Sequence, residues 1–269
     1  MKKYAANKSR ILNESKFTGY THCLNPYIGC GHKCLYCHAR FFIKHKGLEW
    51  GEFLRYRKHI PEKLPKELKK IRFNESTIKV VMGTMTDPYQ QAENEFKLTE
   101  KSLKILYKYR DVVDKLGIFT KSTLIEKDLD LINSFDNPNI HMTISPIAEN
   151  VREILENTES SSADRFKLLK SITDNKDFSN IKIHLNLAPM FPGFTSEEII
   201  EKWCQIISKL NITSIFVDPF MKYKSAVDML DLKLRNNDTW NNQARPTIMF
   251  EYKDWKVDIR EVWKKYFST

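Results

Sequence analysis

The chain has 269 residues, 41% of them hydrophobic, and its 44 Lys and Arg exceed its 34 Asp and Glu, giving a net charge of +10. This length suits one large α/β domain with a substantial core. No segment approaches the roughly 18 apolar residues of a membrane span, and the first residues lack the apolar stretch of a secretion signal, so we expect a cytoplasmic protein without a membrane partner. The positive charge favours an anionic partner such as nucleic acid, although solvated helix faces such as 63–70 can also carry it.

The N-terminal residues 1–20 are polar and predict a loose arm, whereas 21–40 are dense in Cys, His, Gly and aromatic residues, as in a loop built around a ligand. Helical spacing is expected over 49–70, interrupted by Pro61 and Pro65. From residue 77 onward, strands alternate with amphipathic helices. We expect strands at 77–82, 116–120, 140–144, 181–187 and 214–217, and helices at 99–109, 125–135, 162–173 (with Ser162 as its N-cap) and 197–210.

This order, with polar residues at the carboxyl ends of the strands, predicts an α/β fold: a partial (β/α)6 TIM-like barrel of parallel strands behind an N-terminal cluster loop. We count about six strand-helix units after the cysteine-rich loop, fewer than the eight of a full barrel. The predicted core covers 21–220. Residues 221–269, which contain Trp240, Trp255 and Trp263, are expected to form a C-terminal helical appendage packed on that core.

Three of the five cysteines, Cys30, Cys34 and Cys37, have the spacing C-x3-C-x2-C. An odd number of clustered cysteines is unlike a disulfide framework and indicates a metal site in a reducing compartment. Three thiolates on a four-iron cluster leave one iron open, and an open metal is a reaction site. The alternative is a structural zinc completed by His32 or His38 in a nucleic-acid-binding module, but the second ligand pair of a zinc ribbon is missing.

The segment 25–40, with Tyr36 before its last cysteine, resembles the signature of the radical S-adenosylmethionine (SAM) superfamily. Together with 83–90 it is similar to the branch that contains spore photoproduct lyase and DNA repair photolyase-like proteins. The resemblance covers about residues 20–220. It implies a [4Fe-4S] cluster on the three cysteines, SAM on the open iron, and an electron donor such as flavodoxin or ferredoxin. It also implies reductive cleavage of SAM to methionine and a 5′-deoxyadenosyl radical that abstracts hydrogen from a substrate.

The resemblance further implies which residues surround SAM: Tyr36, Thr86, Asp87, Lys121, Ser145, Glu156 and Arg165. Asp87 would face the SAM amino group, with a capped Asp-Pro turn as its alternative role. Lys121 lies at a strand end, where a ligand-binding charge is expected in a barrel, and Ser145 matches a serine at the SAM ribose. Glu156 and Arg165 resemble a pair near SAM, but such a pair can also be a helix-surface ion pair.

One position departs from spore photoproduct lyase. There, a cysteine that returns hydrogen to the product radical precedes the matched pair by two residues, whereas this chain has Thr84, whose O–H bond is too strong for that role. Cys204 or Tyr89 is left as a replacement; otherwise Cys204 and Cys23 resemble buried small hydrophobic residues. We expect a nucleic acid or nucleotide substrate, with a protein or peptide as the alternative.

Overall fold

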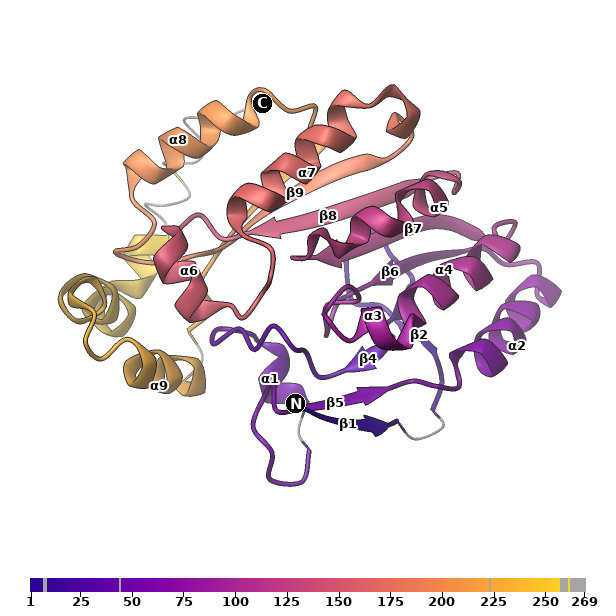
Figure 1. Ribbon diagram of the computed structural model, residues 1–269, viewed down its shortest axis with the longest axis horizontal. Coiled ribbons are helices and arrows are strands. Elements are labelled where there is room, and N and C mark those ends of the chain that lie inside the picture. Colours follow the sequence, from indigo (N-terminus) through magenta and orange to yellow (C-terminus); the bar gives the residue numbers. More distant parts are fainter. Residues whose placement is uncertain (7–8, 44, 223, 257–260, 262–269) are drawn as a thin grey trace.

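A seven-stranded sheet forms the centre of the computed structural model, which describes residues 1–6, 9–43, 45–222, 224–256 and 261 (Figure 1). The strand order is β10-β9-β8-β7-β6-β3-β2, and every neighbouring pair is parallel except β2 with β3. The strands are β2 (Leu12–Glu14), β3 (His22–Leu24), β6 (Ile78–Met82), β7 (Val113–Thr120), β8 (Pro138–Ile144), β9 (Lys182–Met190) and β10 (Ser214–Pro219). The prediction of an α/β fold with a parallel sheet is confirmed, and the sheet is open because β2 and β10 are its edges.

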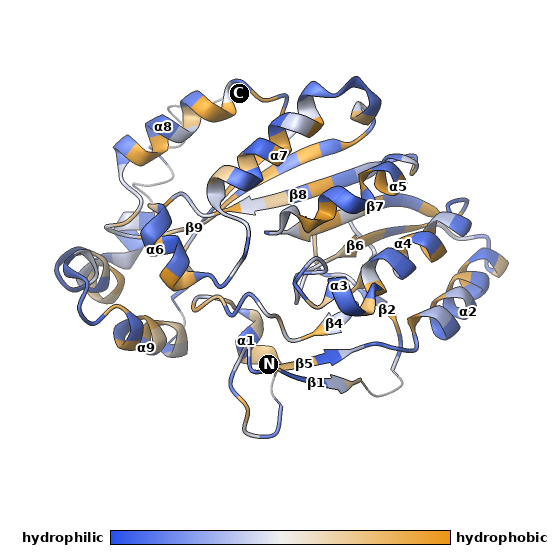
Figure 2. Ribbon diagram, viewed as in Figure 1, coloured by the Kyte–Doolittle hydropathy of each residue, from blue (hydrophilic) through white to orange (hydrophobic). Residues whose placement is uncertain are grey.

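Helices cover one face of this sheet and bury its apolar side chains (Figure 1). The longer helices carry hydrophobic residues among hydrophilic ones (Figure 2), and their buried side chains belong to this apolar core. The helices between the strands are α2 (Ile60–Phe73), α3 (Glu93–Phe96), α4 (Leu98–Lys108), the 3₁₀ helix η1 (Thr123–Asp128), α5 (Leu129–Asn133), α6 (Glu149–Leu155), α7 (Ser162–Asp174), the 3₁₀ helix η2 (Lys176–Phe178) and α8 (Glu197–Ile207).

The prediction of a loose arm over residues 1–20 is wrong. A second sheet, of order β1-β5-β4, contains β1 (Lys2–Ala5), β5 (Phe53–Tyr56) and β4 (Tyr27–Ile28), and β2 forms an edge of the large sheet. Ile11 and Leu12 are buried, and their N–H groups donate to the Glu67 carboxylate on α2 at 2.9 and 2.8 Å. Two apolar residues and one distant carboxylate therefore order a segment whose composition is polar.

Three other expectations differ from the structure in detail. The predicted helix over 49–70 contains β5, and α2 begins only at Ile60, with Pro61 in its first turn, where a missing N–H is tolerated. Ser161, not Ser162, caps α7 and forms a capping box with Asp164. Five strands of the large sheet follow the cysteine loop instead of six, because the sixth parallel strand, β3, precedes that loop.

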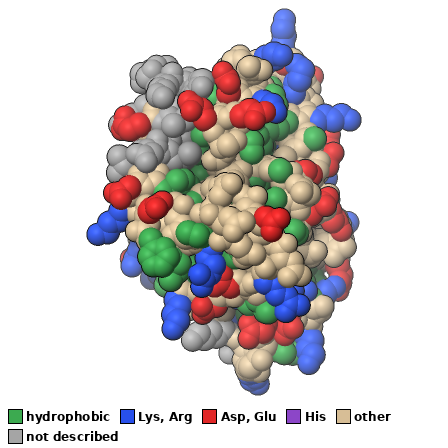
Figure 3. Space-filling view, turned by 90° about the vertical axis from the view of Figure 1, so that its left-hand side faces the viewer, with side chains coloured by type: hydrophobic (Ala, Val, Ile, Leu, Met, Phe, Trp, Pro, Cys, Tyr) green, Lys and Arg blue, Asp and Glu red, His purple; other side chains and the backbone are tan. Residues whose placement is uncertain are grey.

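The C-terminal segment contains α9 (Lys224–Lys233) and the π-helical turns η3 (Trp240–Ala244) and η4 (Thr247–Glu251). Trp240 is fully buried in a second apolar cluster that also includes residues of α6, and Trp255 packs against the main core; Trp263 lies outside the described residues. This end of the molecule exposes hydrophobic side chains among charges of both signs (Figure 3). None of the described helices is long and apolar enough to cross a membrane.

Candidate functional site

The cysteine loop runs from β4 to α1 (Ala39–Phe42) and is held by a buried glutamine from the turn after β6. The Gln90 side-chain oxygen accepts a bond from the Gly31 N–H at 2.8 Å, and its amide donates to Thr86 Oγ1 at 2.9 Å. Thr86 in turn donates to the Gly29 carbonyl at 2.6 Å. Both neighbours of Cys30 are therefore fixed to the end of β6. The role of Gln90 is not visible in the sequence, because a glutamine in a polar stretch gives no sign of burial.

All three loop cysteines are free thiols, with Cys30 and Cys34 buried and Cys37 half-buried. Burial, followed by the Asp87 carboxylate, raises the pKa of Cys30 to about 12, and burial raises the pKa of both other thiols. The charge on Cys37 also raises the pKa of Cys30 and Cys34. Thiolates in so buried a place need a cationic partner.

This donor set fits an iron-sulfur cluster in ligand type, number and spacing. Within the described ranges, no three His, Cys, Asp or Glu side chains converge closely enough to hold a single metal ion. His32, a candidate fourth ligand of a zinc site, has its Nδ1 3.4 Å from Asp87 Oδ2. The three thiols remain the candidate ligands.

The Asp87 carboxylate joins the carboxyl ends of two strands. Its Oδ1 accepts bonds from the Tyr89 N–H at 2.9 Å and the Thr120 hydroxyl at 2.8 Å, and its Oδ2 accepts from the Lys121 N–H at 2.7 Å. Asp87 therefore does more than cap an Asp-Pro turn, since it fixes the backbone of Lys121 at the end of β7. Any contact with SAM would add to these bonds.

Glu156, fully buried at the end of α6, is the centre of a second network. Its Oε1 lies 3.1 Å from Lys121 Nζ and 2.9 Å from Ser145 Oγ, and it also accepts a bond from the Tyr36 hydroxyl. Its Oε2 accepts from Arg165 at 2.9 Å. Burial alone would raise the pKa of Glu156, but Lys121 and Arg165 outweigh it and hold that pKa far below its usual range. Four of the predicted SAM residues, Tyr36, Lys121, Ser145 and Arg165, thus surround the negative charge of the fifth, Glu156.

Arg165 is fully buried on α7, so the alternative of a helix-surface ion pair is wrong. Its two terminal nitrogens donate to the Thr143 carbonyl at 3.1 Å, the Thr158 hydroxyl at 2.7 Å and the Ser160 carbonyl at 3.0 Å, besides Glu156. Arg165 therefore fastens Glu156 to the end of β8.

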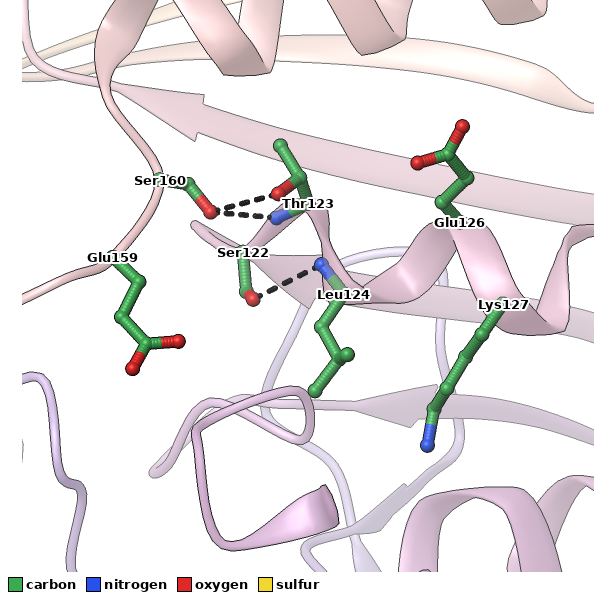
Figure 4. A pocket seen from close by; sticks show the side chains of 7 residues that line it. All are labelled: Ser122, Thr123, Leu124, Glu126, Lys127, Glu159 and Ser160. Carbon is green, nitrogen blue, oxygen red and sulfur yellow. Dashed lines mark hydrogen bonds between the residues drawn. The ribbon is translucent and has the colours of Figure 1, made fainter.

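A surface pocket of about 480 Å³ opens beside this network, between η1 and the loop before α7 (Figure 4). It is lined by Ser122, Thr123, Leu124, Glu126, Lys127, Glu159 and Ser160. None of the predicted cluster or SAM residues lines it, so the pocket is a neighbour of the site and not the site itself.

Cys23 of β3 has surroundings that its place in the sequence does not indicate. Its thiol donates to the Glu14 carbonyl at 3.7 Å, and a hydrogen bond with the Thr84 side chain lowers its pKa, which burial raises. The replacements considered above lie elsewhere: the Tyr89 hydroxyl donates to Asp128 at 3.0 Å, and Cys204 is on α8 in the helix layer. The position of Cys23 near Thr84 depends on strand pairing, because β3 lies beside β6 and Thr84 follows the end of β6.

The sequence model of the Radical SAM superfamily matches residues 24–202, which include the cysteine loop and both networks. The chain belongs to the radical SAM superfamily. An uncharacterized protein of Methanocaldococcus jannaschii is 30% identical over 191 residues, 70% of this chain and 68% of that protein. An uncharacterized protein of Mycobacterium tuberculosis is 27% identical over 246 residues, 87% of this chain and 67% of that protein.

Radical SAM membership implies SAM and a [4Fe-4S] cluster as cofactors. The crystal structure of Streptococcus suis SuiB bound to S-adenosylmethionine shares the fold, with a TM-score of 0.51 and 13% identity over 82% of this chain and 45% of that one. The chain thus spans about two thirds of its sequence relatives and less than half of SuiB.

Proposed function

We propose that the chain cleaves SAM reductively in the manner of spore photoproduct lyase and directs the radical at nucleic acid or a nucleotide. When bound, the cluster would supply one electron to SAM, and SAM the 5′-deoxyadenosyl radical. The observation that carries the proposal is the meeting of two buried assemblies, the anchored cysteine loop and the Glu156 network, at the carboxyl ends of parallel strands, where such folds bind ligands.

Each residue of the networks has a task that follows from its chemistry. Cys30, Cys34 and Cys37 would hold the cluster. Lys121 carries the positive charge that a SAM carboxylate requires, and Ser145 a hydroxyl that can exchange hydrogen bonds with a ribose.

The remaining network residues would bind or orient SAM. Asp87 and Thr86 offer oxygen atoms for its amino group, and Tyr36 lies beside the last cysteine of the loop. Arg165 is a positioning residue, because it acts through Glu156.

Two features support a nucleic acid or nucleotide substrate: the net charge of +10 and the thiol of Cys23 beside Thr84. A thiol can return a hydrogen atom to a substrate radical, with its S–H bond breaking, a C–H bond forming and a thiyl radical remaining on sulfur. Cys23 thus restores, from a neighbouring strand, the group that the sequence lacks at Thr84.

The test is anaerobic reconstitution with iron and sulfide, followed by dithionite and SAM, with chromatographic detection of 5′-deoxyadenosine. Wild type should form 5′-deoxyadenosine, and a triple Cys30/Cys34/Cys37→Ala variant should not. Cys204→Ala is the matched control, since it removes a free cysteine remote from the loop, and it should keep full activity. Equal 5′-deoxyadenosine from the triple variant would refute the proposal.

A further inference from the structure

The large sheet has a second face, which the covering helices do not use. Along each strand, alternate residues point to opposite faces. Ile118, Ile140 and Leu185 belong to the apolar core beneath the helices. Their strand neighbours on the other face are largely polar or aromatic: Lys79, Lys115, Phe119, Asn139, His141, Thr143, Lys182, His184, Asn186, Ser214 and Phe216.

A row of three aromatic rings crosses this second face, and a fourth ring lies beside it. Phe119, His141 and His184 are paired in register on β7, β8 and β9. The His141 ring stacks on Phe119 at 4.2 Å and on His184 at 4.5 Å, with interplanar angles of 11° and 14°. Phe216 of β10, in register with Asn186, lies beside the row, 6.4 Å from His141 and 6.3 Å from His184, and the residue is 49% exposed. We call these four residues the ring row.

His141 leaves one polar atom of the ring row without a partner. Its Nε2 bonds with the Tyr20 hydroxyl at 3.0 Å, but its Nδ1 has no hydrogen-bond partner, although only 5% of the residue is exposed. A buried nitrogen without a partner costs free energy, so such an atom indicates a place where a ligand can contribute a bond.

Three lysines make the second face electropositive. Lys79, Lys115 and Lys182 project from it, and the first and last of them lower the pKa of Lys115 in addition to its burial. Asp114 lies 3.6 Å from Lys79 and offsets part of this charge. The charges acting on the two ring-row histidines are cationic, including Lys115 for both. The α9 end of the molecule, in contrast, mixes both signs (Figure 3).

We propose that the ring row and these three lysines bind single-stranded nucleic acid. Bases stack on exposed rings such as Phe216, and lysines neutralise the phosphates. An acidic peptide would use the lysines but would leave the exposed Phe216 ring without a planar partner. The face leads towards the proposed SAM site, since β8 runs from His141 to its end at Ile144, next to Ser145 of the Glu156 network. The inference rests on the proposed function in one respect: it takes the bound nucleic acid to be the substrate of the radical reaction.

The test is fluorescence anisotropy with a labelled ten-residue oligothymidylate and the reconstituted protein over a series of salt concentrations. Phe216→Ala should weaken binding roughly tenfold, because one base loses its stacking partner. Phe73→Ala is the matched control: Phe73 is 86% exposed at the end of α2, and its removal should leave affinity unchanged. Lys182→Gln should reduce the steepness of the plot of log binding constant against log salt concentration by about 0.7. Lys202→Gln on α8 is its control.

Equal affinity of the Phe216→Ala and Phe73→Ala variants would overturn the proposal. So would competition by thymidine monophosphate or polyglutamate as strong as that by the oligonucleotide. The cysteine triple variant separates this inference from the proposed function. If the triple variant binds the oligonucleotide as wild type does, binding of the strand does not depend on SAM cleavage. A wild type that cleaves SAM but binds no oligonucleotide at low salt would refute the strand site and leave the proposed function intact.

Discussion

The helix-covered face of the large sheet and the carboxyl edge of the same strands are built from opposite kinds of residue. The covered face packs Ile140 and its neighbours into one continuous apolar core, which stabilises the fold through burial. The edge instead buries the charged groups Asp87, Glu156 and Arg165, which are costly to desolvate. A fold that needed only stability would gain as much from apolar residues there, so stability alone does not explain the buried charges of the edge.

The largest expected effect comes from the cysteine loop. Cys34→Ala should reduce SAM cleavage to background, because the cluster loses one of its three thiolate ligands, while the helix-covered face keeps the chain folded. Formation of 5′-deoxyadenosine and the circular dichroism spectrum check both parts. A variant that unfolds would show that loop and core are not separable in this way.

The next effect concerns the buried ion pair. Arg165→Met should lower the free energy of unfolding by about 3–5 kcal/mol, because Glu156 keeps a buried charge with only one of its two cationic partners, Lys121. The double variant Arg165→Met/Glu156→Gln should recover part of this loss. Urea unfolding of both variants checks the prediction, which fails if the double variant is the less stable.

A smaller, pH-dependent effect belongs to the ring row. Burial, with His184 and Lys115, lowers the pKa of His141 from 6.5 to about 3. Below pH 6.5 the unfolded chain therefore takes up a proton that the folded chain refuses, and stability falls with pH until about pH 3. Between pH 7 and pH 5, His141→Phe should lose about 2 kcal/mol less stability than wild type. Equal losses would show that His141 titrates normally.

The smallest expected effect lies on the helix-covered face. Ile140→Val should cost about 0.5–1.5 kcal/mol of stability, because it removes one methylene from a fully buried position. SAM cleavage by the folded variant should match wild type. A large loss of cleavage without a matching loss of stability would mean that the edge and the covered face are coupled.

The parallel strands and their helices were predictable because long, periodic segments such as β9 carry their own signal. The short strands β2 and β3 were missed, since three residues show no period and their order depends on distant partners such as Glu67. In the site, the spacing of the cysteines identified the loop. The contacts of Gln90 with the cysteine loop and of Cys23 with Thr84 link residues that are far apart in the sequence, so they can be seen only in the folded chain.

The most direct test of the central claim is metal analysis of the anaerobically reconstituted protein together with low-temperature electron paramagnetic resonance of its reduced form, with and without SAM. The account predicts about four iron and four sulfide per chain, and a signal that shifts when SAM binds the open iron. Bound zinc without sulfide, or a cluster signal that SAM leaves unchanged, would contradict it.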